Sequence, residues 1–141
     1  MTRGVFFSII GGLILFIVNP SFSAIINVPD DYSTIQAGIN AAVNGDTVLV
    51  APGTYTENID INGKNIVVTS LFGADSTTIQ ASNTDIAVVS FISNEPKGAA
   101  ISGFTIAGSN CSGVSCIGSS PTIKNNNIMA VSYTHLRAHE T

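Results

Sequence analysis

Short runs of β-branched residues, broken at regular intervals by turn residues, constrain the fold of this chain more than any other feature. No run exceeds seven residues, and Gly, Pro, Asn and Asp fill the breaks between the runs. We expect one strand or more in each of these runs: 46–50, 57–61, 65–69, 77–80, 86–92, 100–106 and 121–124. The sequence therefore predicts an all-β fold built from many short strands.

The spacing of apolar residues indicates how these strands are arranged. Val48, Val68, Val88 and Ile106 recur at intervals of 20, 20 and 18 residues. A period near 20 residues is typical of a solenoid, in which each coil carries about three short strands that pair with the coils on either side. Two alternatives are an antiparallel hairpin closed at Asn62-Gly63 and a β-sandwich. We favour the solenoid because of the recurring interval.

One helix is predicted, over residues 34–43, where apolar residues follow each other at i, i+4, i+7 and i+8. Ser33 and Gln36 fit a capping box, in which the hydroxyl accepts from a helical amide and the glutamine side chain reaches back. Gly45 suits the left-handed position at the helix end. Such a helix would cover the open N-terminal end of the stacked coils, as the end of a solenoid requires.

Residues 1–24 have the features of a secretory signal. Arg3 precedes an apolar run of 14 residues, 5–18, which is too short to span a bilayer as a helix. Pro20 breaks the run, and the small residues that follow predict cleavage after Ser23 or Ala24. The alternative is an uncleaved membrane anchor. We expect a secreted or cell-surface protein with no stable membrane span after cleavage.

The last eleven residues, 131–141, differ in composition from everything before them. They contain both histidines of the chain, His135 and His139, at a spacing that would suit a zinc pair on a helix. The whole string, however, resembles the translation of a sequencing-library adapter. We therefore expect residues 131–141 to be no structural part of the protein, and the histidines to bind no metal. The expected domain is then 25–130, the N-terminal part of a longer solenoid.

Three segments carry a family resemblance: 33–42 (STIQAGINAA), 45–59 (GDTVLVAPGTYTENI) and 63–66 (GKNI). They resemble the opening of pectin-lyase-like proteins, including pectinesterases, and 101–106 and 118–128 look like later coils of the same group. The resemblance covers about 100 residues and implies a right-handed parallel β-helix that acts on or binds polysaccharide. It carries no catalytic residue over to this chain, because the family's catalytic aspartates and arginine lie on coils beyond the matched stretch.

Several matched residues have a physical role in such a fold. Pro52-Gly53 joins a fixed φ to a permissive one, which allows a sharp turn between two faces of a coil. Tyr55 and Ile59 should point into the core. Asn58 and the run 125–127 would either stack with asparagines of adjacent coils and satisfy backbone groups, or lie in solvated turns.

The number and spacing of the charged residues argue against nucleic-acid binding and give no catalytic site. Segment 25–130 holds eight carboxylates and only three separated lysines, so it has no basic patch for a nucleic-acid backbone. A glycosidase needs two paired carboxylates, and the adjacent Asp30 and Asp31 instead precede a helix, where negative charge favours the macrodipole. We assign no catalytic, cofactor-binding or metal-binding residue.

Cys111 and Cys116 are the only cysteines. In an exported protein they could form a disulfide across a short loop, with a gain of about 2–3 kcal/mol. The alternatives are two small buried residues, or pairing with cysteines of further coils. Two cysteines with no histidine in the mature segment make a metal site improbable.

Two functions follow from these observations. The first is a non-catalytic module that binds polysaccharide or another partner through weakly charged coils rich in Asn, Gly and Ser. The second is the N-terminal part of a carbohydrate-active enzyme, a pectinesterase or polysaccharide lyase, whose active site lies outside this chain. We favour the binding module because no catalytic constellation is visible in the sequence.

Overall fold

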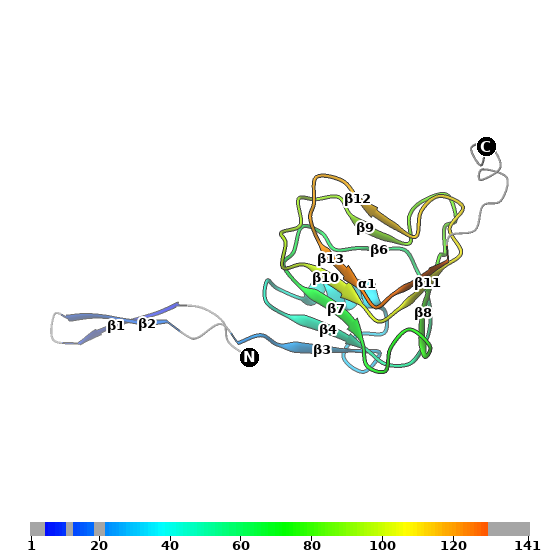
Figure 1. The fold of residues 1–141 in the computed structure, drawn as a ribbon. Helices are drawn as coiled ribbons and strands as arrows, with labels where there is room; N and C mark the ends of the chain where they lie inside the picture. The colour runs from blue at the N-terminus through cyan, green and yellow to red at the C-terminus, as the bar shows by residue number, and fades with distance from the viewer. Residues whose placement is uncertain (1–4, 11–12, 19–21, 130–141) are drawn as a thin grey trace.

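The computed structural model describes residues 5–10, 13–18 and 22–129, and their strands β3 to β14 form a parallel β-solenoid of about four turns (Figure 1). Every pairing among these strands is parallel, and one short helix is present. The predicted solenoid is therefore confirmed, and both the hairpin at Asn62-Gly63 and the sandwich are wrong. Right-handed coiling stays a prediction. The predicted tail 131–141 lies outside the described residues.

Three parallel sheets run along the solenoid, and each of the three complete coils (β4–β6, β7–β9 and β10–β12) contributes one strand to each sheet. The first sheet has the order β13-β10-β7-β4-β3. Its strands are β3 (Ile25–Val28), β4 (Thr47–Val50), β7 (Val67–Ser70), β10 (Ala100–Ser102) and β13 (Thr122–Lys124).

The other two sheets are shorter. The second sheet contains β5 (Gly53–Thr56), β8 (Thr77–Gln80), β11 (Thr105–Ala107) and β14 (Asn127–Met129). The third contains β6 (Ile59–Asp60), β9 (Val89–Phe91) and β12 (Val114–Cys116). Strands of two to four residues suffice because the inner strands of each sheet pair with both the coil before and the coil after them.

Register places residues of like kind above one another inside the solenoid. Ile26, Val48, Val68 and Ile101 are consecutive partners on the first sheet, and all four are buried. Full burial of a Val or Ile side chain contributes about 1.5–3 kcal/mol. These aliphatic ladders, with Phe91 and Phe104 between them, form the core.

The predicted interval of about 20 residues between equivalent positions of successive coils holds only from Val48 to Val68. Val48 pairs with Val68, but the next partner of Val68 is Ile101. Val88 immediately precedes β9 of the third sheet, and Ile106 pairs with Ile79 on the second sheet. The four residues therefore do not form one ladder, because turns of different length at the corners change the number of residues per coil.

Helix α1 (Ile35–Ala41) packs against β3, β4 and β6, at the N-terminal end of the stack. The N-cap is Thr34, whose side chain accepts a hydrogen bond from the Ala37 amide at 3.1 Å. The predicted capping box at Ser33 is therefore wrong by one residue. The helix also ends before the predicted 43, at C-cap Ala42, which is extended. Gly45 has a positive φ of 96°, but in the turn before β4 and not as the helix cap.

Side chains from the next coil hold both ends of this helix. The carboxylate of Glu57 accepts from the backbone amides of Ile35 and Gln36, each at 2.9 Å. The ammonium of Lys64 donates to the carbonyls of Ile39, Asn40 and Ala42, at 2.7, 2.8 and 2.7 Å. Both charges complement the helix macrodipole and satisfy groups that a helix end leaves open.

The N-terminal edges of two sheets are closed by side chains that take the place of a missing strand. The amide of Gln36 accepts from the Asp60 N–H at 2.8 Å and donates to the Asp60 carbonyl at 3.0 Å, on β6. The Asp31 carboxylate accepts from the Asn27 N–H at 2.7 Å, and the Asp31 N–H donates to the Asn27 carbonyl at 2.7 Å, on β3. Gln36 thus acts on a strand edge and not on the N-cap. An unpaired strand edge is a site of aggregation, and these bonds remove it.

Strands β1 (Val5–Ile10) and β2 (Leu13–Val18) lie apart from the coils (Figure 1). They pair in an antiparallel hairpin that extends away from the solenoid in Figure 1. In the part of the chain that the structure describes, no helix is long and apolar enough to cross a membrane.

Candidate binding surface

The outward side of the second sheet carries two rows of side chains in register. Thr54, Thr78, Thr105 and Asn127 form one row, and Thr56, Gln80, Ala107 and Met129 form the other. We call these eight residues the second-sheet face. All eight are half-buried or exposed, whereas Ile79 and Ile106 between the rows point inward and are buried. Neighbouring strands lie about 4.8 Å apart, so the first row repeats a hydroxyl or amide group at that interval, and the second row does so at Thr56 and Gln80.

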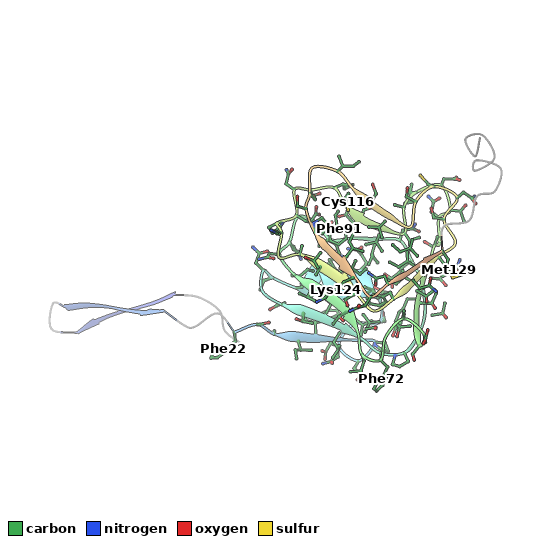
Figure 2. All side chains as sticks on the ribbon, in the orientation of Figure 1. Phe22, Phe72, Phe91, Cys116, Lys124 and Met129 are labelled. Atoms are coloured by element: carbon green, nitrogen blue, oxygen red, sulfur yellow. The ribbon has the colours of Figure 1, made fainter. Side chains whose placement is uncertain are left out.

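A loop between β7 and β8 lies beside this face. The hydroxyl of Thr105 donates to the carbonyl of Ala74, in the loop, at 2.8 Å. The same loop carries Leu71 and Phe72, and the Phe72 side chain is 69% exposed. Figure 2 shows Phe72 at the periphery of the molecule, with its side chain directed outward. The loop that contacts Thr105 through Ala74 thus also carries an exposed aromatic ring.

The outward side of the first sheet differs in chemistry. Its rows are Ile25, Thr47, Val67, Ala100 and Thr122, and Asn27, Leu49, Thr69, Ser102 and Lys124. Aliphatic side chains alternate with polar ones, and one lysine is present. This first-sheet face offers fewer hydrogen-bonding groups in an unbroken row than the second-sheet face.

Several charged side chains form hydrogen bonds with backbone groups of the protein itself. Besides Glu57 and Lys64 at the helix, the Asp46 carboxylate accepts from the amides of Ala24 and Val43, each at 2.9 Å. No group of three or more His, Cys, Asp or Glu residues that could hold a metal ion occurs among the described residues. No charged residue lies on the second-sheet face.

Glu95 is a buried carboxylate at the corner between the third and first sheets. It is 2% exposed and accepts from the amides of Gly63 and Ser93, at 2.9 and 3.0 Å, and from the Ser119 hydroxyl at 2.5 Å. Burial raises the pKa of this carboxyl group, but the hydrogen bonds from Ser119, Gly63 and Ser93 outweigh it and hold the pKa below its ordinary value. One side chain thereby joins the turns of three successive coils.

Asn58 binds backbone groups of the next coil. Its side-chain amide donates to the carbonyls of Asn83 and Ala87, at 3.0 and 2.9 Å, and its oxygen accepts from the amides of Ser82 and Asn83 and from the Ser82 hydroxyl. The partners are turn residues and not a stack of asparagine side chains. Asn126 acts in the same way on the preceding coil, through the Phe104 amide and the Ile101 carbonyl.

The remaining predicted residues are at corners and in the core. Pro52-Gly53 lies at the turn from β4 into β5, and Gly53 has a positive φ of 150°. Ile59 is buried, and Tyr55 is half-buried against the core with its hydroxyl donating to the Ala51 carbonyl at 2.8 Å. Burial raises the pKa of the Tyr55 phenol, with a smaller contribution from the negative charges of Glu57 and Asp30.

Cys111 and Cys116 are both exposed free thiols in the structure. The disulfide between them stays a prediction. Burial of the thiol raises the pKa of Cys116, and the negative charge of Glu95 adds to this rise.

Comparison with known proteins identifies no relative. No protein-family model matches the chain, and neither a curated protein nor a solved structure matches it significantly. The parallel solenoid is therefore established by the structure alone, and the pectin-lyase-like identity is not.

Proposed function

We propose that this chain is part of an exported, pectin-lyase-like parallel β-helix that binds a neutral polysaccharide without cleaving it. The second-sheet face carries this proposal: it is an uncharged surface on which hydroxyl and amide groups recur at the strand spacing. A polysaccharide also repeats its hydroxyl groups along one axis, so an extended chain can bind several strands through similar contacts. The exposed ring of Phe72 lies on the loop that contacts this face through Ala74, and it offers a stacking surface for a sugar.

The charge of the chain favours a neutral ligand over an anionic one. Segment 25–130 has eight carboxylates against three lysines, and the ammonium of Lys64 is bound to three carbonyls of the helix. An anionic polysaccharide such as polygalacturonate would meet net repulsion and no cluster of cations. Binding should therefore change little with salt concentration.

Affinity electrophoresis of the whole chain in gels that contain a neutral β-glucan, a mannan or polygalacturonate tests the proposal. We expect retardation by at least one neutral polysaccharide and none by polygalacturonate. Enzymatic cleavage is measured in parallel from the release of reducing ends, and none is expected. Retardation by polygalacturonate alone would overturn the assignment of a neutral ligand.

A matched pair of variants locates the surface. Thr78→Glu places a carboxylate on the second-sheet face, and Thr69→Glu places the same group on the first-sheet face of the same coil; both threonines are half-buried. Thr78→Glu should weaken binding by about tenfold or more, which corresponds to about 1.4 kcal/mol, and Thr69→Glu should leave it unchanged. Phe72→Ala should also weaken binding, with Ile92→Ala as its exposed apolar control. The reverse result for the two threonines would assign binding to the first-sheet face.

A further inference from the structure

The nitrogen of Ala24 lies 2.9 Å from a carboxylate oxygen of Asp46. Asp46 is 3% exposed, and its other oxygen accepts from the Val43 amide at 2.9 Å. The carbonyl of Ala24 accepts from the Thr47 amide at 2.9 Å. Ala24 is thus fixed on both sides immediately before β3, so its nitrogen has a defined position next to a buried negative charge.

Ala24 also lies next to a predicted signal-peptide cleavage site. Cleavage of an export signal requires small residues one and three positions before the cut bond. Ser23 and Ser21 meet this requirement for the bond between Ser23 and Ala24. The alternative bond, after Ala24, places Phe22 at the third position, which is not small.

From these two observations we propose that a signal peptidase cleaves the bond between Ser23 and Ala24. In this proposal the new α-ammonium group of Ala24 pairs with the Asp46 carboxylate and stabilises the first coil. The inference depends on the export signal predicted for residues 1–24 and is independent of the proposed polysaccharide binding. A signal peptidase would hydrolyse the peptide bond with one water molecule. The hydroxyl group of that water joins the Ser23 carbonyl carbon, and its hydrogen joins the Ala24 nitrogen. This amine then takes a proton from solvent, because its ordinary pKa is about 7.7–8.0.

The chemical change strengthens a contact that already exists. Before cleavage, Ala24 donates to Asp46 through a neutral amide; after cleavage, the donor is a cation with three hydrogens. The bond before cleavage already has a charged acceptor, and after cleavage the attraction between two opposite charges is added to it. The bond from the Ser23 hydroxyl to the Gly45 carbonyl is lost with the leader. Cleavage after Ala24 would instead remove the Ala24 contacts with both Asp46 and Thr47.

The test uses the full chain produced in an export-competent host. The intact mass of the exported protein should correspond to a first residue of Ala24. A matched variant carries one extra alanine between Ser23 and Ala24, which keeps the cleavage site but leaves the Ala24 nitrogen as an amide. We expect the extra residue to lower the thermal midpoint by about 4–8 °C with Asp46 present and by much less in the Asp46→Asn background. A first residue of Ile25, an unprocessed chain, or equal midpoints with Asp46 present would overturn the proposal.

A second measurement does not require Asp46→Asn to fold. The α-amino group is labelled at pH 7 with an amine-reactive reagent, and the rate is read from the mass of the N-terminal peptide. We expect labelling at Ala24 to be at least about tenfold slower than labelling of the extra alanine, because the paired ammonium must dissociate first. Equal labelling rates would show that the terminal amine does not pair with Asp46, and would contradict the proposal.

Discussion

Glu57 and Lys64 close opposite ends of the same seven-residue helix, and both come from the coil that follows it in the chain. An isolated helix of this length is unstable in water, since nucleation costs more than so few hydrogen bonds return. The anion at its N-terminus and the cation at its C-terminus therefore make the N-terminal cap depend on the second coil.

Removing the anion should destabilise the fold. Glu57→Ala leaves the amides of Ile35 and Gln36 without their acceptor, and we expect the free energy of unfolding to fall by about 1.5–3 kcal/mol. Urea unfolding followed by circular dichroism measures the change. Asp75→Ala, at an exposed turn, is the control and should cost less than about 0.5 kcal/mol. Equal losses for the two variants would contradict this role of Glu57.

Removing the cation should have an effect of similar size at the other end. Lys64→Met keeps most of the aliphatic length of the side chain but removes three hydrogen bonds to helix carbonyls, so we expect a loss of about 1.5–3 kcal/mol. The exposed Lys97 provides the matched control, Lys97→Met. If both lysine variants unfold at the same urea concentration, Lys64 does not hold the helix.

Asn58 should be intolerant even of a change to aspartate. Asn58→Asp keeps the acceptor for Ser82 and Asn83 but loses the donor to the carbonyls of Asn83 and Ala87, against which a carboxylate would be repelled. We expect a loss of about 2 kcal/mol or more at neutral pH. Asn83→Asp, at an exposed position of the same turn, should be nearly neutral. Thermal unfolding distinguishes the two, and a neutral Asn58→Asp would show that its donated bonds contribute little.

Replacing one buried hydroxyl group, that of Thr77, should stabilise the fold. Thr77 is fully buried, and its Oγ1 has no hydrogen-bond partner among the described residues. Thr77→Val removes the unsatisfied group and keeps the shape, so we expect the free energy of unfolding to rise by about 1 kcal/mol. Thr78→Val, on the outward side of the same strand, should change it by less than about 0.5 kcal/mol. A destabilised Thr77→Val would show that the hydroxyl is satisfied in solution.

Glu95 should make stability depend on pH in the acid range. Its folded-state pKa is lowered, so its stabilising contribution is complete above the pKa of the unfolded chain, about 4.3. That contribution is lost as the pH falls from there through the folded-state pKa. In Glu95→Gln the free energy of unfolding should depend less on pH in this acid range. At pH 7 it should be lower by about 1.5–3 kcal/mol, because an amide oxygen cannot accept from all the donors. If urea unfolding shows the same pH dependence for Glu95→Gln as for the original chain, Glu95 is not its source.

The sequence predicts the architecture well and the coil boundaries poorly. Alternating β-branched runs and the apolar stripe of the helix are local signals, and the parallel solenoid and α1 follow from them. Strands β3, β5, β12 and β14 were not predicted. Two of them begin with a residue that marks a turn in the sequence, Gly53 in β5 and Asn127 in β14. The run 100–106 is two strands, since Gly103 adopts a positive φ of 82° between them.

The functional surface and the charged contacts could not be found from local patterns. Glu57, Lys64 and Glu95 each bind groups of an adjacent coil that lie 21 to 32 residues away in the chain. Thr54, Thr78 and Thr105 align only because corner turns of unequal length bring their strands into register. A residue count along the chain does not contain those turn lengths.

The closed N-terminal edge gives the molecule a direction of assembly. Gln36 and Asp31 occupy the outer edges of β6 and β3, so at these two sheets further strands can pair only on the C-terminal side. Each finished coil then offers a pairing template to the segment that follows it in the chain. Folding can thus proceed in the order of synthesis, one coil at a time, without waiting for distant parts of the chain.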